Sequence, residues 1–379
     1  MKCPMTYSPR RLAPPLLALL LLAGCGDRET TTGLDVASAL GGDATAGFAR
    51  ANAPRQFDFP ADHNAHPAFR NEWWYFTGQL TAANGERFGY QVTFFRIALA
   101  PPAPPRASAW ATQQLWMAHS ALTAIDAGRH WHRERFARDA LGLAGQQSEP
   151  FRVWLEDWTL AGGDGGTFPW QLSIDAGDFT LVFTLEPQRE PVLQGDGGLS
   201  QKSAETGNAS YYYSITRLTT TGTLTVGEEQ YAVTGLSWLD REWSTSALGE
   251  GQAGWDWFSL QLASGDDLML YQLRREDGSR DRHSAGLLLG ADGRRQPLSA
   301  DAFSLEPARW WQAESGVRYP VAWRLQVPGA SLDLRIEAAV DDQEMATAVR
   351  YWEGAVEVRA AESGAAAGRG YLEMTGYDS

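Results

Sequence analysis

The sequence predicts an all-β protein, and three observations support that prediction. Apolar and polar residues alternate over short runs, as in 90–94 and 179–186, which is the pattern of strands with one buried face. Turn-forming pairs such as Asn84-Gly85 separate these runs. Long helical periodicity is nearly absent, and 134–143 is the best stretch for a short helix. Many short strands joined by tight turns are typical of a sandwich or a barrel.

The second half of the chain repeats this pattern. Residues 323–327 alternate, the pair Pro328-Gly329 predicts a turn, and the alternation resumes at 332–336. The pairs Asp277-Gly278 and Asp292-Gly293 mark further turns. A length of 379 residues suggests about two domains. We expect two antiparallel β domains, 56–235 and 236–379, with a boundary near Gly235.

The first residues are expected to be a targeting segment rather than part of the fold. Basic residues precede an apolar run at 16–23 that is too short to span a bilayer. The run ends in Leu22-Ala23-Gly24-Cys25, which resembles the bacterial lipobox. That resemblance implies a signal peptide over 1–24, lipidation of Cys25 and a membrane-anchored, periplasm-facing protein of the cell envelope. An ordinary secretory cleavage site is the alternative. Residues 25–55 are read as a flexible tether.

Charge and cysteine content exclude several partners and stabilising devices. The net charge is −14, so a nucleic-acid partner or a polybasic membrane patch is not expected. Of the two cysteines, Cys3 would leave with the signal peptide and Cys25 would carry lipid. No disulfide would remain, and a chain of this length can rely on its core instead.

The histidines and the short motifs predict neither a metal nor a cofactor. Asp62, His63 and His66 lie close in sequence, as do His130 and His132. A zinc site needs three or four converging ligands with supporting partners, so these side chains are interpreted as turn caps or backbone contacts. G-x-S-x-G, G-x-G-x-x-G opening a helix and the P-loop are all absent from the sequence.

A polar, glycine-rich loop at 191–214 leads into the triple tyrosine Tyr211 to Tyr213. It contains Lys202, the single lysine beyond the expected signal peptide. The loop either covers the mouth of a cavity, with Lys202 and the tyrosines donating hydrogen bonds to a ligand, or is a solvated rim. The sequence leaves both readings open.

The stretch 236–262 is the one around which we expect the rest of the chain to be organised. Its four tryptophans are interspersed with Asp240, Arg241, Glu242 and Asp256, and 71–76 (N-E-W-W-Y-F) has a similar mixture. We expect the two stretches to meet in space. If the first is extended, Trp238, Asp240 and Glu242 share one face, opposite Arg241 and Trp243.

Carboxyl groups held against aromatic rings have raised pKa values and can act as general acids, and tryptophan faces can stabilise a cation. Asp240, Glu242 and Asp256 are therefore the candidate catalytic residues, for protonation of an alkene. The alternative is that Arg241 and Arg96 bind these acids as structural ion pairs, most plausibly Arg241 with Glu72.

At these residues the chain resembles the AttH/CrtC family, which includes carotenoid 1,2-hydratases and lipoproteins called predicted secreted hydrolases. The resemblance rests on 59–78, 207–214, W-L-D-R-E-W-S at 238–244 and G-W-D-W-F at 254–258, and it runs to 377. It implies two lipocalin-like antiparallel β-barrel domains and an apolar ligand, such as a polyene, an isoprenoid or a lipid. The residues that we expect to contact this ligand are Glu72, Trp74, Tyr212, Trp238, Arg241, Trp243, Trp255 and Tyr271.

The resemblance also shows two departures. In the hydratases a histidine follows the aspartate of the W-x-D motif, where this chain has Arg241, and an acid stands where it has Leu273. The first hypothesis is a hydratase that adds water to a C=C bond. A non-catalytic, lipocalin-like carrier is the alternative, and a secreted hydrolase is the second. The expected partners are an apolar molecule, the membrane through Cys25 and an envelope transport protein.

Overall fold

The structure is a computed structural model that describes Met1 and residues 45–104, 107–246 and 248–378. The described residues from 45 onward lie within one compact unit. Cys25 and the expected signal peptide after Met1 lie outside the described residues. Within the described part of the chain, no helix has both the length and the apolar character needed to cross a bilayer.

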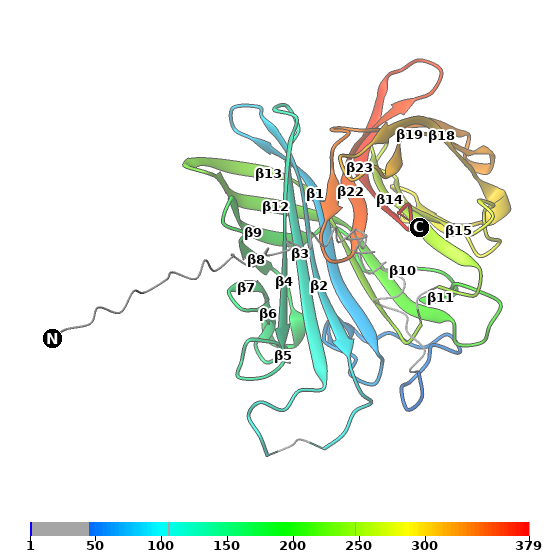
Figure 1. Cartoon of the computed structure of the whole chain (residues 1–379). Helices are drawn as coiled ribbons and strands as arrows, with labels where there is room; N and C mark the ends of the chain where they lie inside the picture. The colour runs from blue at the N-terminus through cyan, green and yellow to red at the C-terminus, as the bar shows by residue number, and fades with distance from the viewer. Residues whose placement is uncertain (2–44, 105–106, 247, 379) are drawn as a thin grey trace. The chain divides into compact units, whose positions relative to one another are not determined.

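The first antiparallel sheet has thirteen strands among the described residues (Figure 1). Two short strands, β10 (Val192–Leu193) and β11 (Leu199–Gln201), pair with β12 beside its main path. In spatial order that path is β4 (Arg129–Arg138), β3 (Gln114–Ala124), β2 (Arg87–Ala98), β1 (Asn71–Ala82), β13 (Glu229–Ser244), β12 (Ala209–Val226), β9 (Phe179–Pro187), β8 (Trp170–Asp175), β7 (Trp158–Ala161), β6 (Phe151–Leu155) and β5 (Ala144–Ser148).

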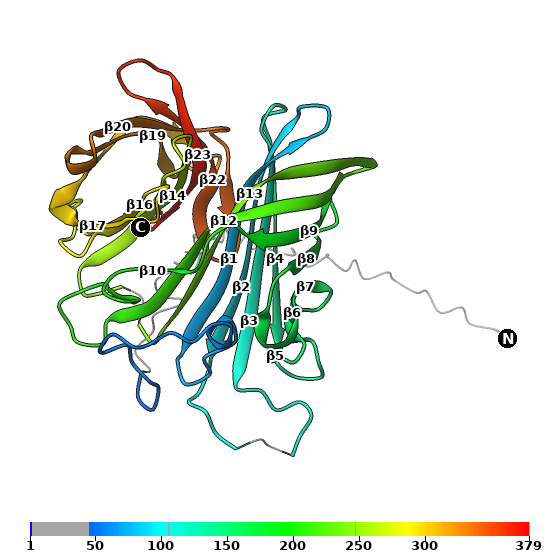
Figure 2. The same ribbon diagram turned by 180° about the vertical axis from the view of Figure 1, so that it is seen from behind.

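The second antiparallel sheet has ten strands in the described part of the chain (Figure 2). Strand β21 (Glu344–Ala346) pairs with β22 at its side. The spatial order is β17 (Arg295–Ser299), β16 (Ala285–Leu289), β15 (Asp267–Arg275), β14 (Gln252–Leu262), β23 (Ala366–Thr375), β22 (Arg350–Ala360), β20 (Leu332–Ala338), β19 (Arg318–Val327) and β18 (Ser304–Gln312). Four short 3-10 turns complete the described elements: η1 (Ala61–His63), η2 (Asp164–Gly166), η3 (Ala300–Ala302) and η4 (Pro328–Ala330).

The all-β prediction is confirmed, with one nearly closed barrel and one half-barrel. The second sheet curls round on itself, while the first is a curved half-barrel (Figure 1). Asn84-Gly85 turns β1 into β2, and Gly85 has φ +91°, a conformation that glycine adopts without strain. The predicted strands at 90–94, 179–186 and 323–327 all form.

The predicted helix at 134–143 is wrong. Residues 129–138 form β4 instead, and β4 pairs along its length with β3. The run E-R-F-A-R-D-A-L contains good helix formers, but helix propensity is a weak preference that tertiary pairing overrides. His119 on β3 and Glu134 on β4 stand directly opposite each other, so the pairing also aligns two polar side chains.

The expected boundary at Gly235 falls inside β13. This strand pairs with β1 from Val233 to Ser244, so its whole length belongs to the first sheet. The chain crosses to the second sheet between Ser244 and Gln252. Residues 45–55, expected to be tether, also pack on the first sheet: Ala51 is buried, and Arg50 donates to the Gly207 carbonyl.

Each sheet fills its own concave side with apolar residues. The core of the first sheet includes Trp74, Phe76, Leu239 and Trp243, and that of the second includes Phe258 and Trp323. Side chains one position away along a strand point to the opposite face. On β1, β13 and β14 those side chains are Tyr75, Trp238 and Trp257, which form a third apolar cluster between the sheets.

Candidate active site

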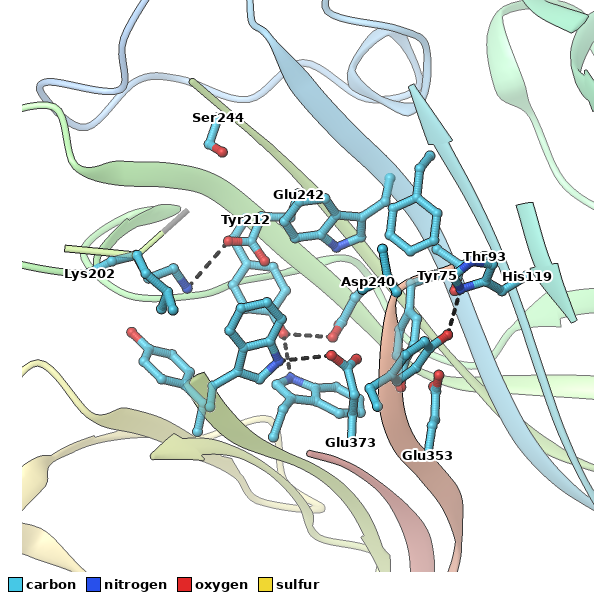
Figure 3. Close-up of a pocket in the computed structure, with 18 of the residues that line it drawn as sticks. Tyr75, Thr93, His119, Lys202, Tyr212, Asp240, Glu242, Ser244, Glu353 and Glu373 are labelled. Atoms are coloured by element: carbon cyan, nitrogen blue, oxygen red, sulfur yellow. Dashed lines mark hydrogen bonds and ion pairs between the residues drawn. The ribbon is translucent and has the colours of Figure 1, made fainter. Parts of the chain in front are cut away.

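A cavity of about 110 Å³ lies between the two sheets and outside both cores. A cavity of this volume can hold several water molecules. We call it the inter-sheet cavity. Its walls come from β1, β2, β3, β12 and β13 on one side and from β14, β15, β22 and β23 on the other (Figure 3). The apolar cores of the two sheets lie on the other faces of these strands.

Aromatic rings make up much of the cavity wall. Trp257 meets Tyr75 edge-on, with ring centroids 5.1 Å apart, and meets Trp238 at 6.5 Å. The rings that line the cavity are Trp73, Tyr75, Phe95, Tyr212, Trp255, Trp257, Tyr271 and Tyr351. Such a wall suits an apolar molecule, and its tryptophan faces suit a developing positive charge.

Asp240 on β13 is the central carboxyl group of the first-sheet wall. Its Oδ1 accepts hydrogen bonds from Ser214 Oγ at 2.5 Å and Trp238 Nε1 at 2.7 Å, and its Oδ2 accepts from the Tyr212 hydroxyl at 2.6 Å. The residue is only 3% exposed. Burial raises the pKa of Asp240 to about 7, although these three hydrogen bonds favour the carboxylate. Asp240 therefore titrates near neutral pH.

Glu373 on β23 faces the same space from the second sheet (Figure 3). Its Oε1 accepts a hydrogen bond of 2.8 Å from Trp255 Nε1. Burial raises the pKa of Glu373 to about 7, against the Trp255 hydrogen bond and with the help of the negative charges of Asp240 and Glu242. Two carboxyl groups from different sheets thus titrate in the same range.

Glu353 on β22 is the third carboxyl group of the cavity. It stands directly opposite Glu373 across the β22–β23 ladder and is 1% exposed. Burial, and then the charge of Glu373, raise the pKa of Glu353 well above its usual range; the facing hydroxyls of Tyr75 and Tyr351 oppose this only in part. Neither carboxyl oxygen has a hydrogen bond of normal geometry among the described residues. We therefore expect Glu353 to hold a proton at neutral pH.

Lys202 brings the glycine-rich loop to the cavity. Its Nζ lies 3.3 Å from Glu242 Oε1 and 4.3 Å from the centroid of the Tyr271 ring. Burial alone would lower the pKa of Lys202, but Glu242, Tyr271 and Asp240 together outweigh burial and raise it. Lys202 and Glu242 therefore form an ion pair in the wall. Of the triple tyrosine, Tyr212 faces the cavity, and Tyr211 and Tyr213 face the first core.

His119 on β3 lines the cavity next to Tyr351. Its Nδ1 lies 2.7 Å from the Tyr351 hydroxyl, and its Nε2 lies 2.9 Å from Glu134 Oε1. The imidazole is fully buried. This contact joins the first sheet to β22 of the second (Figure 3).

The opposite face of β1 and β13 carries a different cluster, centred on Glu72. Its carboxylate accepts from Arg96 Nε, from Arg241 Nη2 at 3.0 Å and from the His66 backbone N–H at 3.0 Å. The Arg241 guanidinium also lies 3.8 Å from the centroid of a Trp74 ring. Burial opposes the charge, but Arg96 first and then His66 and Arg241 outweigh it, so the pKa of Glu72 falls well below its usual range.

The prediction that Arg241 pairs with Glu72 is confirmed. Four side chains expected to contact a ligand, Glu72, Trp74, Arg241 and Trp243, lie on this face and not in the inter-sheet cavity. The reason is the alternation of side chains along a strand, which turns these residues away from Tyr75, Asp240 and Glu242. The motif at 238–244 thus contributes Arg241 and Trp243 to a structural cluster and Asp240 and Glu242 to the cavity.

Asp256 does not line the cavity either. It points with Phe258 into the second sheet, where it accepts from the Tyr377 hydroxyl at 2.9 Å and lies 3.3 Å from Arg274 Nε. This placement removes Asp256 from the candidate acids. Among the other sequence-predicted residues, Tyr212, Asp240, Glu242, Trp255 and Tyr271 line the cavity, and Trp238 lies behind Asp240 as its donor.

The sequence analysis missed Glu353, Glu373 and His119. A usable signal was present for both glutamates. Glu373 alternates with the core residues Leu372 and Met374, and Glu353 follows the core residue Trp352. Each glutamate also has a tyrosine two positions earlier on its own face, Tyr351 and Tyr371, and a carboxyl group beside aromatic rings is the pattern that singled out Asp240.

The histidines of the early motifs make structural contacts. His63 Nδ1 lies 2.6 Å from the Tyr213 hydroxyl, and the His66 ring stacks on Trp243 with centroids 3.7 Å apart. His130 Nδ1 lies 2.9 Å from Thr123 Oγ1. Within the described ranges, no group of three or more His, Cys, Asp or Glu side chains converges as metal ligands would.

Comparisons with known proteins agree with this architecture. The profile of the AttH-like family matches residues 50–377. The crystal structure of a candidate AttH protein from Nitrosomonas europaea is 38% identical, with a TM-score of 0.76, covering 86% of this chain and 99% of that one. None of the curated proteins matches the sequence.

Two more distant structures share the fold. Kievitone hydratase from Nectria haematococca is 16% identical, with a TM-score of 0.64, covering 86% of this chain and 95% of that one. CghA is 14% identical, with a TM-score of 0.52, covering 92% of this chain and 98% of that one.

Proposed function

This chain belongs to the AttH-like family, and from that premise we propose that it is a hydratase. In this proposal it binds an apolar small molecule in the inter-sheet cavity and adds water across a C=C bond. The observation that carries the proposal is the pair Asp240 and Glu373. Both carboxyl groups line one aromatic cavity, each from a different sheet, and each has a pKa raised to about 7.

Such a pair can supply both an acid and a base. Two carboxyl groups that repel each other do not ionise together, so one keeps its proton while the other is charged. Near neutral pH the protonated member can donate and the ionised member can accept. Hydration of an alkene needs both events, one at a carbon atom and one at the attacking water.

The proposed steps balance without a redox partner. The protonated carboxyl group gives its proton to one alkene carbon, and the π electrons form the new C–H bond. The other carbon becomes a cation, which the faces of Trp255 and Trp257 stabilise. A lone pair of water forms the C–O bond, and the ionised carboxylate removes a proton from that oxygen. The two carboxyl groups exchange roles, and the product is an alcohol.

Structures of the same fold provide context for this chemistry. One is a hydratase of kievitone, and CghA has been solved with Sch210972. A bound small molecule in that fold is compatible with a ligand here. The identity of the ligand is left to experiment.

The alternative is a carrier that holds an apolar molecule without converting it. Two observations favour it. The resemblance implies a histidine and an acid where this chain has Arg241 and Leu273, and Arg241 is held in the Glu72 cluster. A hydrolase finds less support. Both ring nitrogens of His119, the one cavity-lining histidine among the described residues, contact Tyr351 and Glu134 rather than a serine.

The test is incorporation of heavy oxygen from water. The purified full-length protein would be incubated with an acyclic carotenoid that carries terminal isoprenoid double bonds. We expect labelled tertiary alcohol from the wild type and a loss on the order of 10²-fold or more in Asp240→Asn and Glu373→Gln. Asp256→Asn, a change of a buried acid that faces away from the cavity, is the matched control. Saturable binding without label would support the carrier instead.

We also propose that Cys25 carries a lipid and holds the protein on the periplasmic side of the envelope. The support is the sequence Leu22-Ala23-Gly24-Cys25 after a basic start. Cys25→Ala should move the protein from the membrane fraction to the soluble fraction. A variant that still sediments with membranes after a high-salt wash would contradict the proposal.

A further inference from the structure

A line of polar contacts runs from the surface of the first sheet to Tyr351, which lines the cavity with Glu353. It begins at Glu134 on β4, whose side chain is 17% exposed. Glu134 Oε1 lies 2.9 Å from His119 Nε2, and His119 Nδ1 lies 2.7 Å from the Tyr351 hydroxyl. Tyr351 and Glu353 are two positions apart on β22, so they share the face that lines the cavity.

The fold holds this line in place from both sheets. His119 and Glu134 are direct cross-strand partners on β3 and β4. The Glu134 carboxylate also accepts from the backbone N–H of Ala348, which precedes β22, at 3.1 Å. His119 stacks on Tyr351 with ring centroids 5.6 Å apart. A fully buried histidine is destabilising unless both of its ring nitrogens have hydrogen-bond partners, and both do here.

Each member of the line can both give and take a proton. An imidazole can accept a proton at one nitrogen while it releases one from the other. A tyrosine hydroxyl is a donor and an acceptor at once. At the inner end, Glu353 has no hydrogen bond of normal geometry at either oxygen among the described residues, and those oxygens are closed to solvent.

We propose that Glu134, His119 and Tyr351 form a proton path between solvent and Glu353, and through Glu353 to the carboxyl groups of the inter-sheet cavity. In one inward pass, Glu134 gives a proton to Nε2 of His119. Nδ1 gives its proton to the Tyr351 oxygen, and the Tyr351 hydroxyl proton passes to Glu353. Glu134 then takes a proton from water, and no electrons change hands.

This path has a use when an apolar molecule fills the cavity. Such a ligand excludes water from the cavity and isolates the carboxyl groups from bulk solvent. Glu353 is the direct cross-strand neighbour of Glu373, so a proton on Glu353 can equilibrate with Glu373. The path therefore extends the proposed function, because it lets the cavity carboxyl groups keep the right number of protons behind a bound ligand. The exchange of protons itself needs no turnover.

The charged and titratable groups that face Glu353 come from three elements. Tyr75 faces it from β1, Tyr351 from its own strand β22, and Glu373 and Tyr371 from β23. Tyr351 is the tyrosine whose contact continues toward the surface, through His119. Tyr371 on β23 is a buried tyrosine of the same inter-sheet cluster and is outside the line. It offers a matched control.

The experiment follows hydrogen–deuterium exchange of the Glu353 carboxylic acid by infrared spectroscopy. Purified full-length protein at neutral pH would be diluted into heavy water, and the carbonyl band of the protonated acid followed in time. Glu353→Gln identifies the band by removing it. We expect exchange to slow at least about tenfold in Tyr351→Phe and in Glu134→Gln, which is modest for loss of a positioned proton-transfer group. Tyr371→Phe should exchange at the wild-type rate.

Two outcomes would overturn the path. One is exchange at the wild-type rate in both Tyr351→Phe and Glu134→Gln. The other is a spectrum that Glu353→Gln leaves unchanged, which would mean that Glu353 carries no proton. Glu134 lies at the partly exposed end of the line, so Glu134→Gln still tests the path if Tyr351→Phe does not fold. A protein that exchanges through this path but makes no labelled alcohol would refute the hydratase and not the path.

Discussion

Glu72 and Asp240 lie on opposite faces of the same pair of strands, and both are buried, yet their environments drive them to opposite charge states. Glu72 receives two guanidinium groups and a backbone N–H, and its pKa falls below the usual range. Asp240 accepts hydrogen bonds from three neutral donors and forms no ion pair among the described residues, and its pKa rises to about 7. Burial is common to both, so the difference comes from the partners.

This comparison separates a structural site from a chemical one within a single sequence motif. A carboxylate that is fully paired and ionised at all ordinary pH values stabilises the fold and has no proton to offer. A carboxyl group that is hydrogen-bonded but lacks a cation keeps a proton near neutral pH. The residues of W-L-D-R-E-W at 238–243 therefore serve two purposes, one on each face of β13.

The largest expected effect is on stability and comes from the Glu72 cluster. Glu72→Gln leaves the Arg96 and Arg241 guanidiniums buried without their carboxylate. Removing one partner from a buried ion pair costs about 3–5 kcal/mol of unfolding free energy, which urea unfolding can measure. Arg324→Gln is the control, because Arg324 and Asp333 form an ion pair that is largely exposed; its unfolding midpoint should hardly move. An equally small change in Glu72→Gln would show that the cluster is not structural.

The second prediction concerns the pH dependence of stability, in which the two faces should act with opposite signs. Asp240 has a folded pKa of about 7, above its unfolded value of ~3.9. Between pH ~4 and ~7 the folded state holds more protons at this site, so its contribution to stability is lost as pH rises through that window. Glu72 has a depressed folded pKa, so its contribution is present above pH ~4.3 and is lost as pH falls below that value.

The measurement is the unfolding free energy from pH 4.5 to 7.5 for the wild type and Asp240→Asn. The difference between the two should change by roughly 1 kcal/mol per pH unit in the steepest part of the window, in the direction of wild-type stability falling with rising pH. Taking the difference cancels the contribution of other titrating groups. A flat difference would show that Asp240 is ionised throughout, and the acid assignment would fail.

The sequence predicted much of this comparison and missed a defined part. Alternation along 238–243 placed Asp240 and Glu242 on one face and Arg241 on the other, and the pairing of Arg241 with Glu72 followed from the cost of a buried cation. Alternation is a property of one strand, so it can be read without the fold. The choice of face as cavity or core could not be read, because both faces of β1 and β13 carry tryptophans and charges.

The parts that were missed depend on contacts between distant segments. Glu353 and Glu373 join Asp240 only because the outer face of the second sheet packs on that of the first. His119 is separated from Tyr351 by more than half of the chain. Asp256 had the same local pattern of aromatic neighbours as Asp240, but Arg274 and Tyr377 bind it inside the second sheet. The local sequence pattern identifies candidate acids, and the packing of the two sheets decides which of them line the cavity.

The smallest effect should come from removing a single neutral donor from the cavity. Trp255→Phe keeps an aromatic ring in the wall but loses the indole N–H that donates to Glu373 Oε1 at 2.8 Å. That hydrogen bond favours the charged form and lowers the pKa of Glu373 against the effect of burial, so the variant should titrate at higher pH. A hydrogen bond to a charged group is worth about 1.5–3 kcal/mol, which corresponds to a rise of roughly one to two pH units. The pH dependence of the Glu373 carbonyl band, assigned with Glu373→Gln, would measure this rise.

Trp257→Phe is the matched control, because that indole donates to the Tyr212 hydroxyl at 3.1 Å and not to Glu373. An unshifted or lowered titration in Trp255→Phe would show that the Trp255 N–H does not set the proton affinity of Glu373. The contrast between the two faces could then not be attributed to neutral donors.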